Sequence, residues 1–157
     1  MQKRIIDQVV SNKDQVQLSW LNLEQKALVE ITSEDEAFPI ENSFSDTEGA
    51  GWKAGKSGKQ TIRIIFDEPQ DIKLIRLKFC EKDQTRTQEF QLRWLPANNQ
   101  AYREIVRQQF NFNQPDSITE SEDYSVGLQN LKALELQINP DITNKESFAT
   151  LAKFQIS

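Results

Sequence analysis

Two short runs of acidic residues are the first candidates for chemistry in this sequence: Glu34-Asp35-Glu36, and Glu120 with Glu122 and Asp123. Two carboxylates hydrolyse a glycosidic bond when they are held roughly 5–9 Å apart across a cleft, and loop carboxylates also bind calcium. Neighbouring acids in polar segments are more often solvated turns, and we favour that interpretation for both runs. A carboxylate enzyme would instead require a buried pair with strongly shifted pKa values.

Residues 50–57, Ala-Gly-Trp-Lys-Ala-Gly-Lys-Ser, come close to the glycine-rich loop that holds phosphates. That loop requires a glycine at its first position and a helix directly after it, whose N-terminus holds the phosphate. Here Ala50 takes the first position and a strand-like segment follows, so we reject a nucleotide site. Three lysines near Trp52 could contact nucleic acid, but the net charge of −5 argues against that partner.

The absence of histidine restricts catalysis further. The 157 residues include 0 histidines and one cysteine, Cys80. A Ser-His-Asp triad, a Cys-His pair and a His-ligated zinc site are therefore excluded, and one thiol is too few for a thiolate metal cluster. Catalysis would have to depend on carboxylates, lysine, tyrosine or serine, so we expect a binding protein and not an enzyme.

Runs in which hydrophobic and polar residues alternate dominate the chain. Such alternation is typical of antiparallel strands with one buried face. Residues 71–80 change phase at Leu74 and Ile75, which predicts a β-bulge there, and the polar residues 67–71 before them predict a turn. We therefore expect a hairpin over residues 61–80. The other clear runs are residues 27–31, 90–95, 133–138 and 148–156.

Two segments allow two interpretations. Residues 102–109 have helical spacing but lie among predicted strands, and we favour a strand; residues 21–28 could be a short helix or a strand. Trp20 and Trp94 are expected to pack in the structure, while Trp52 could pack or bind. About eight short strands without a long helix predict an all-β jelly-roll β-sandwich, formed by residues 1–157 as a single domain.

The order of several motifs resembles the galactose-binding-like superfamily, which includes discoidin domains, coagulation-factor C-type domains and carbohydrate-binding modules of the same fold. The motifs are Asn42-Ser43-Phe44-Ser45-Asp46, Gly51-Trp52-Lys53-Ala54, the strand of residues 60–66 and the strand of residues 70–77. The resemblance covers residues 38–157, with residues 4–31 as the leading strands. It implies an eight-stranded jelly roll that binds ligands, most commonly sugars, through loops at one end.

The resemblance also implies a structural calcium ion, held by an Asp loop and by a Glu of the closing strand. Asp46 matches the first ligand, but Lys153 stands near the position of that Glu. A cation there opposes calcium, so we expect no cofactor, with Asp46 as the candidate ligand if calcium binds.

A second resemblance concerns the cellular compartment. Residues 52–62 resemble the "W-x-A-x-K-x-G-x-x-T-I" segment of the amino-terminal domain of the single-strand-break repair scaffold protein, an intracellular domain of the same fold. The N-terminal residues include no apolar signal segment, and no Asn-x-Ser/Thr sequon occurs. We therefore expect a cytoplasmic protein without a membrane span.

Sugar sites of this fold combine an aromatic platform with polar groups on loops. The candidate ligand-binding residues are Phe44 as the platform, with Arg86, Asn98, Asn99, Tyr102 and Tyr124. We expect a carbohydrate-binding module; the alternative is an intracellular protein-interaction module, or a subunit of a larger assembly, with no sugar ligand. A concave loop cluster lined by aromatic and polar groups would favour sugar, and an exposed apolar patch would favour protein. The oligomeric state stays open.

Overall fold

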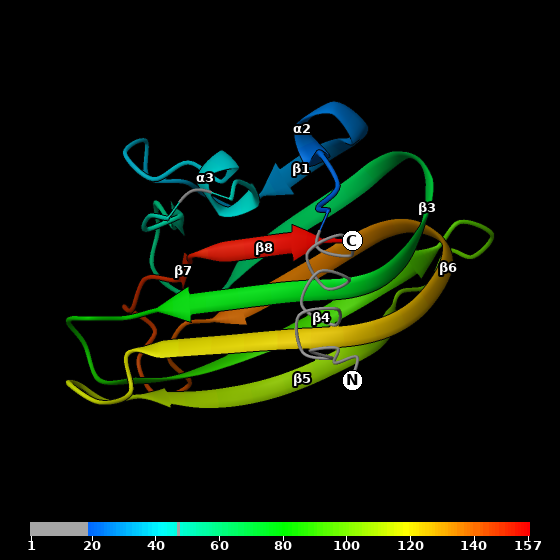
Figure 1. The fold of residues 1–157 in the computed structure, drawn as a ribbon. Helices are drawn as coiled ribbons and strands as arrows, with labels where there is room; N and C mark the ends of the chain where they lie inside the picture. Colours follow the sequence, from blue (N-terminus) through cyan, green and yellow to red (C-terminus); the bar gives the residue numbers. More distant parts are fainter. Residues whose placement is uncertain (1–18, 47) are drawn as a thin grey trace, which may run out of the picture.

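Two long antiparallel strands, β3 (Gln60–Cys80) and β6 (Thr119–Asn139), organise the fold in the computed structural model, which describes residues 19–46 and 48–157. Both strands bend midway, so that each contributes to both layers of a β-sandwich (Figure 1). The other elements are α2 (Leu23–Lys26), β1 (Ala27–Ile31), α3 (Glu41–Phe44), β2 (Trp52–Lys53), β4 (Arg86–Pro96), β5 (Arg103–Phe112), β7 (Thr150–Leu151) and β8 (Lys153–Ile156).

The strand order explains how the two layers form. The main sheet has the order β1-β3-β6-β4-β5, and β8 also pairs with β3. The first half of β3 pairs with β1, whereas its second half pairs with β8, for example at Leu77 and Phe154. The layer with β1, β4 and β5 therefore lies opposite the layer with β8. The pair β2 and β7 forms a separate two-stranded sheet.

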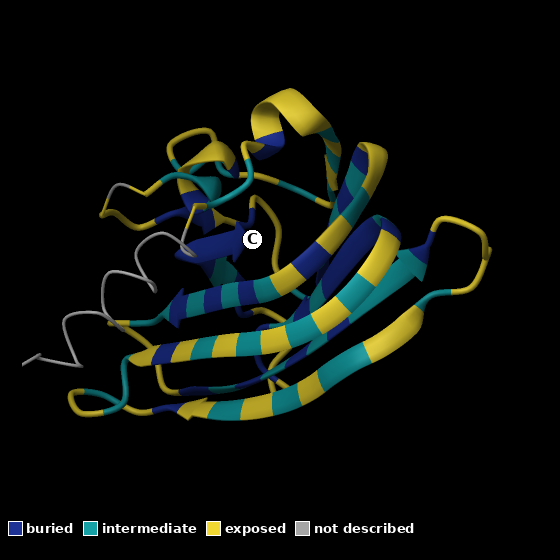
Figure 2. Ribbon diagram, turned by 45° about the vertical axis from the view of Figure 1, so that its right-hand side comes forward, coloured by how far each residue is buried: buried dark blue, intermediate teal, exposed yellow. Residues whose placement is uncertain are grey.

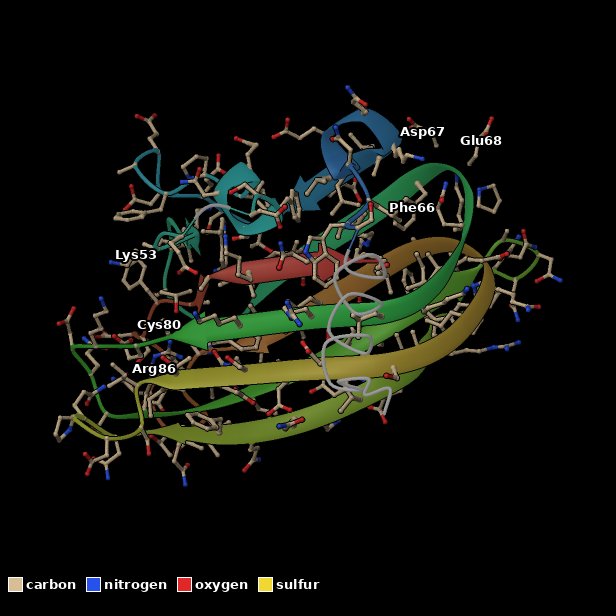
Figure 3. The ribbon with its side chains drawn as sticks, viewed as in Figure 1. Lys53, Phe66, Asp67, Glu68, Cys80 and Arg86 are labelled. Atoms are coloured by element: carbon tan, nitrogen blue, oxygen red, sulfur yellow. The ribbon has the colours of Figure 1, made fainter. Side chains whose placement is uncertain are left out.

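The predicted turn at residues 67–71 is wrong, because β3 continues through it as one bent strand. Both halves of β3 pair with β6 and not with each other, with register shifts between Ile65 and Leu74. Pro69 lies at this bend. The pairing with β6 is irregular there, so the N–H that proline lacks is not needed for a hydrogen bond between strands. Phe66 is buried, whereas Asp67 and Glu68 are exposed at the outside of the bend (Figure 3).

The expected change of phase in β3 is confirmed. Residues 60–66 are buried at even positions, whereas Ile75, Leu77 and Phe79 are buried at odd positions. The last register shift lies between Ile72 and Leu74, directly before the predicted bulge. The extra residues of the bend move the hydrophobic side chains of both halves of the strand to the inside of the sandwich.

The core lies between the two layers, and Figure 2 shows buried positions on strands of both layers. Each aromatic or branched side chain that is fully buried there contributes about 1.5–3 kcal/mol of hydrophobic stabilisation. Trp52 is one of them, and its Nε1 donates to the carbonyl oxygen of Ser33 at 3.1 Å, so this tryptophan packs and does not bind. The largest of the others are Phe66, Phe79, Phe90, Phe112 and Phe154.

The last predicted strand is divided in two. Ala152 separates β7 from β8, and the buried residues before it are Ala149 and Leu151. Phe148, which the alternation placed on the buried face with Phe154, is instead 46% exposed. The backbone of Gly51 packs closely against the backbone at this break. Gly51 has φ +74°, and a Cβ atom on it would lie 2.2 Å from the carbonyl oxygen of Leu151, so only glycine fits here.

The two ambiguous segments are resolved. Residues 103–112 form β5, as favoured, while residues 21–28 contain both alternatives, since α2 leads directly into β1. The all-β jelly-roll prediction is confirmed, and within the described ranges no helix has the length and apolar character needed to cross a membrane. Most of the predicted leading segment lies outside the described residues, and a single domain over residues 1–157 stays a prediction.

Candidate ligand-binding site

The bends of β3 and β6 bring both ends of each strand to the same end of the sandwich, on the left of Figure 1. Five of the connections between elements gather there, whereas the hairpin between β4 and β5 lies near the opposite end. We call this region the loop end, and it comprises residues 32–40, 54–59, 81–85, 113–118 and 140–149.

Backbone hydrogen bonds fix these loops to one another. The N–H of Asp35 donates to the carbonyl oxygen of Lys53 at 2.9 Å, and the N–H of Gly58 donates to that of Ser147 at 2.9 Å. The N–H of Ala54 donates to the carbonyl oxygen of Ala149 at 3.0 Å. Loops held in this way present their side chains in a preorganised arrangement, which lowers the entropy lost on binding.

A hollow of about 420 Å³ lies between these loops. It is open to solvent and lined mainly by charged and polar side chains, with one exposed aromatic ring. We call it the Phe148 hollow. Its lining includes Glu34, Asp35, Lys53, Asp83, Gln84 and Phe148.

Phe148 is the unusual member of this lining. The exposed part of its ring can serve as a flat apolar surface for a ligand. The two residues beside it, Ser147 and Ala149, accept the backbone hydrogen bonds from Gly58 and Ala54, which fix the chain at the rim of the hollow. Alternation along the sequence had predicted Phe148 as a core residue, so the sequence contained no signal for this position.

Arg86, a predicted ligand residue, lies behind the hollow and is only 3% exposed. Its Nε donates to Glu81 at 2.8 Å, its Nη1 to the carbonyl oxygen of Pro140 at 2.8 Å, and its Nη2 to Thr150 Oγ1 at 3.2 Å. The guanidinium also lies over the Phe112 ring, 4.6 Å from its centroid. These contacts join the loop before β4 to the loop after β6, so the geometry fits a positioning role for Arg86. Figure 3 labels Arg86 at the loop end.

Three predicted residues lie near the opposite end of the sandwich. Asn98 and Asn99 belong to the hairpin between β4 and β5, where Asn99 Oδ1 accepts from the N–H groups of Gln100 and Ala101. The ring of Tyr102 lies 5.1 Å from the guanidinium of Arg93. The structure therefore does not bring these residues together with Arg86.

Tyr124 and Phe44 occupy two further places. The Tyr124 hydroxyl donates to Gln108 Oε1 at 2.7 Å, and burial, followed by the nearby Glu122 and Glu120 charges, raises its pKa. Phe44 is half-buried in α3 and packs on Phe154, with ring centroids 6.3 Å apart. The ring that we predicted as a platform at Phe44 thus packs partly against the core.

At the candidate calcium position, the oxygen atoms accept hydrogen bonds from side chains of β8. Gln155 Nε2 donates to Asp46 Oδ1 at 2.8 Å, and Lys153 Nζ donates to the carbonyl oxygen of Ser45 at 2.7 Å. An ammonium group beside the Asp46 loop opposes a divalent cation. In residues 19–46 and 48–157, no group of three or more Asp, Glu, Cys or His residues is arranged to hold a metal ion. These residues do not fit calcium.

Glu120 departs from the solvated-turn prediction. It is 1% exposed and accepts hydrogen bonds from Gln88 Nε2 at 3.2 Å and Gln108 Nε2 at 3.3 Å. Burial, followed by the charge of Glu122, raises the pKa of Glu120 to about 7. Gln108 Nε2 also donates to Glu122 at 2.6 Å. Both carboxylates therefore accept hydrogen bonds from glutamine side-chain amides.

No protein-family model matches this chain, and no curated protein matches it. Solved structures do share its fold. The CBM32 module of AlyQ, in complex with 4,5-unsaturated mannuronic acid, has a TM-score of 0.60 at 14% identity, covering 84% of this chain and 95% of that one. A pectin-binding carbohydrate-binding module has a TM-score of 0.58 at 17% identity, covering 85% of this chain and 91% of that one.

A longer protein also contains this fold. The GH29 fucosidase of Ruminococcus gnavus has a TM-score of 0.69 at 8% identity, covering 99% of this chain. This chain spans 30% of the length of the fucosidase. These similarities confirm the jelly-roll fold that the motif order had implied.

Proposed function

We propose that this chain is a non-catalytic carbohydrate-binding module and that the sugar binds in the Phe148 hollow. The fold supports this, because solved structures with the same architecture are described as carbohydrate-binding modules. The observation that carries the proposal is Phe148 itself, a ring 46% exposed at a hollow lined by polar groups. The C–H face of a sugar ring packs against an aromatic surface while its hydroxyl groups find polar partners.

The polar lining offers both kinds of hydrogen-bonding group. The carboxylates of Asp35 and Asp83 accept from sugar hydroxyls, Gln84 both donates and accepts, and Lys53 donates. One oxygen of Asp35 is already used by the N–H of Ala37 at 3.0 Å, which orients the carboxylate. Arg86 contributes indirectly, because its contacts with Glu81 and Pro140 join the loop that carries Asp83 and Gln84 to the loop that carries Phe148.

The second candidate function is a protein-interaction module. Ile142 is 45% exposed and lies in the same loop of the loop end as Phe148. Two exposed apolar side chains in one loop could contact a protein partner. This candidate would be favoured if the unmodified chain binds no glycan but binds a protein partner, and if Phe148→Ala abolishes that protein binding.

A glycan array followed by affinity electrophoresis of the purified chain tests the carbohydrate proposal. We expect the chain to bind at least one glycan class, and Phe148→Ala to weaken that binding at least about tenfold by removing the aromatic surface. Leu28→Ala is the matched control, since Leu28 is a large hydrophobic residue 59% exposed on β1. Reducing-end assays on the bound glycan are expected to detect no cleavage.

Two outcomes would contradict the proposal. One is the absence of glycan binding across the array, and the other is equal binding by Phe148→Ala and the unmodified chain. Thermal unfolding of both variants checks that any loss of binding is local.

A further inference from the structure

The Phe148 hollow is strongly acidic. Four carboxylates line it, and Lys53 is the one ammonium group in the same lining. Arg86, whose side chain is 0% exposed, forms an ion pair with Glu81 at 2.8 Å and compensates one of the four. The three others are those of Glu34, Asp35 and Asp83. A ligand in the hollow therefore meets an excess of negative charge.

Backbone N–H groups hold two of these carboxylates in place. Glu34 Oε1 accepts from the N–H of Ile40 at 2.6 Å, and Asp35 Oδ1 accepts from the N–H of Ala37 at 3.0 Å. Each of these carboxylates has a second oxygen for a further donor. Their orientation is fixed before binding, so a ligand cation or hydroxyl meets preorganised acceptors.

Lys53 offsets only one of the three remaining carboxylates. Its Nζ lies over the Phe38 ring, 5.1 Å from the centroid, where the ring face attracts the ammonium group. An anionic sugar in the hollow would be attracted by this single cation and repelled by several carboxylates.

We infer that the Phe148 hollow selects sugars by charge: sugars with an ammonium group bind most tightly, neutral sugars less tightly, and uronic acids most weakly. The inference rests on the proposed function, since it concerns the same site. The jelly-roll fold does not fix this preference, because the AlyQ module of the same fold is in complex with an unsaturated mannuronic acid. The selectivity comes from the side chains of the loop end.

Two series of monosaccharides that differ mainly in charge test the inference. The first is galactosamine, galactose and galacturonic acid; the second is glucosamine, glucose and glucuronic acid. Binding is measured by NMR titration of the full chain at low and high salt. In at least one series we expect the amine to bind roughly tenfold more tightly than the uronic acid, with the neutral sugar between them, and the difference to shrink at high salt.

The double variant Asp35→Asn/Asp83→Asn assigns the selectivity to the hollow. Whatever its effect on absolute affinity, the ratio between the amine and the neutral sugar is expected to fall toward one. Asp123→Asn is the control, because Asp123 is an exposed carboxylate paired with Arg76 on β6 and β3, outside the lining. This control is expected to keep the ratio of the unmodified chain.

The outcomes separate this inference from the proposed function. If none of the six sugars binds and the glycan array is negative, both fail. If neutral sugars bind but the uronic acid binds as tightly as the amine, the charge selectivity is overturned and the binding function stands. An unchanged ratio in Asp35→Asn/Asp83→Asn would also overturn it.

Discussion

Two glutamates of β6, Glu135 and Glu120, are almost equally buried but lie in opposite chemical surroundings. Glu135 is 2% exposed on the polar face of the main sheet, and Glu120 is 1% exposed between the two layers. Burial by itself raises the pKa of Glu135, but hydrogen bonds from Arg93 and Arg63 outweigh it, so the pKa lies below its ordinary value. For Glu120, burial and then Glu122 raise the pKa to about 7.

Strand register produces this difference. Glu135 lies opposite Arg63 on β3 and Arg93 on β4, and both guanidinium groups donate to its carboxylate. Glu120 lies opposite Phe79, and its hydrogen-bond donors are the amides of two glutamines. The hydrogen bond from Gln88 lowers the pKa of Glu120, but burial and the charge of Glu122 outweigh it. Burial therefore determines the cost of the charge, and the cross-strand neighbours determine whether that cost is offset.

The largest effect is expected from the double variant Arg63→Met/Arg93→Met, which gives Glu135 the surroundings of Glu120. An ionised carboxylate left buried without a cation costs about 3–5 kcal/mol of stability. Urea unfolding at pH 7 measures the loss. Arg107→Met is the control, because Arg107 is 55% exposed and pairs with Glu89 and Glu104 at the surface. A loss no larger than that of the control would contradict the comparison.

Glu120→Gln is expected to stabilise the protein at pH 8. The folded pKa of Glu120, about 7, lies above its ordinary value of 4.5, so the folded state keeps the proton after the unfolded state has lost it. Stability from this group is complete below pH 4.5 and falls as the pH rises to about 7, by about 3 kcal/mol at most. Denaturant unfolding between pH 4 and 8 is expected to show this slope for the unmodified chain and a flatter one for the variant; equal slopes would refute the assignment.

The smallest effect is expected from Glu122→Gln. It removes the second cause of the raised pKa of Glu120 and leaves burial, the first cause, in place. The titration midpoint of Glu120 is therefore expected to move below that of the unmodified chain, and the stability at pH 8 to rise by less than about 1 kcal/mol. Carboxyl ¹³C NMR measures the midpoint, and a midpoint that does not move would exclude a charge interaction between the two glutamates.

The strands could be predicted from the sequence because their pattern is local. Alternation correctly placed Ile62, Ile64 and Phe66 in the core. It failed where the chain changes direction without a turn: the polar residues 67–71 form the outside of a bend in β3. It failed again at Phe148, because the break at Ala152 ends the alternation.

The candidate site could not be predicted in the same way. Arg86 and Tyr124 were chosen for chemical type, and each has a defined partner in the structure, Glu81 and Gln108 respectively. Which loops meet at one end depends on the bends of β3 and β6. No pattern within one segment contains that information.

The sequence by itself determined the all-β class, the one-sided burial of the strands, the acidic charge and the absence of histidine chemistry. The tertiary structure alone decided that Phe148 stands exposed at a hollow and that Glu135, not Glu120, receives two arginines. The physical reason is the range of the interactions. Alternation depends on adjacent residues, whereas Glu135 and Arg63 are 72 positions apart and meet only through the register of two folded strands.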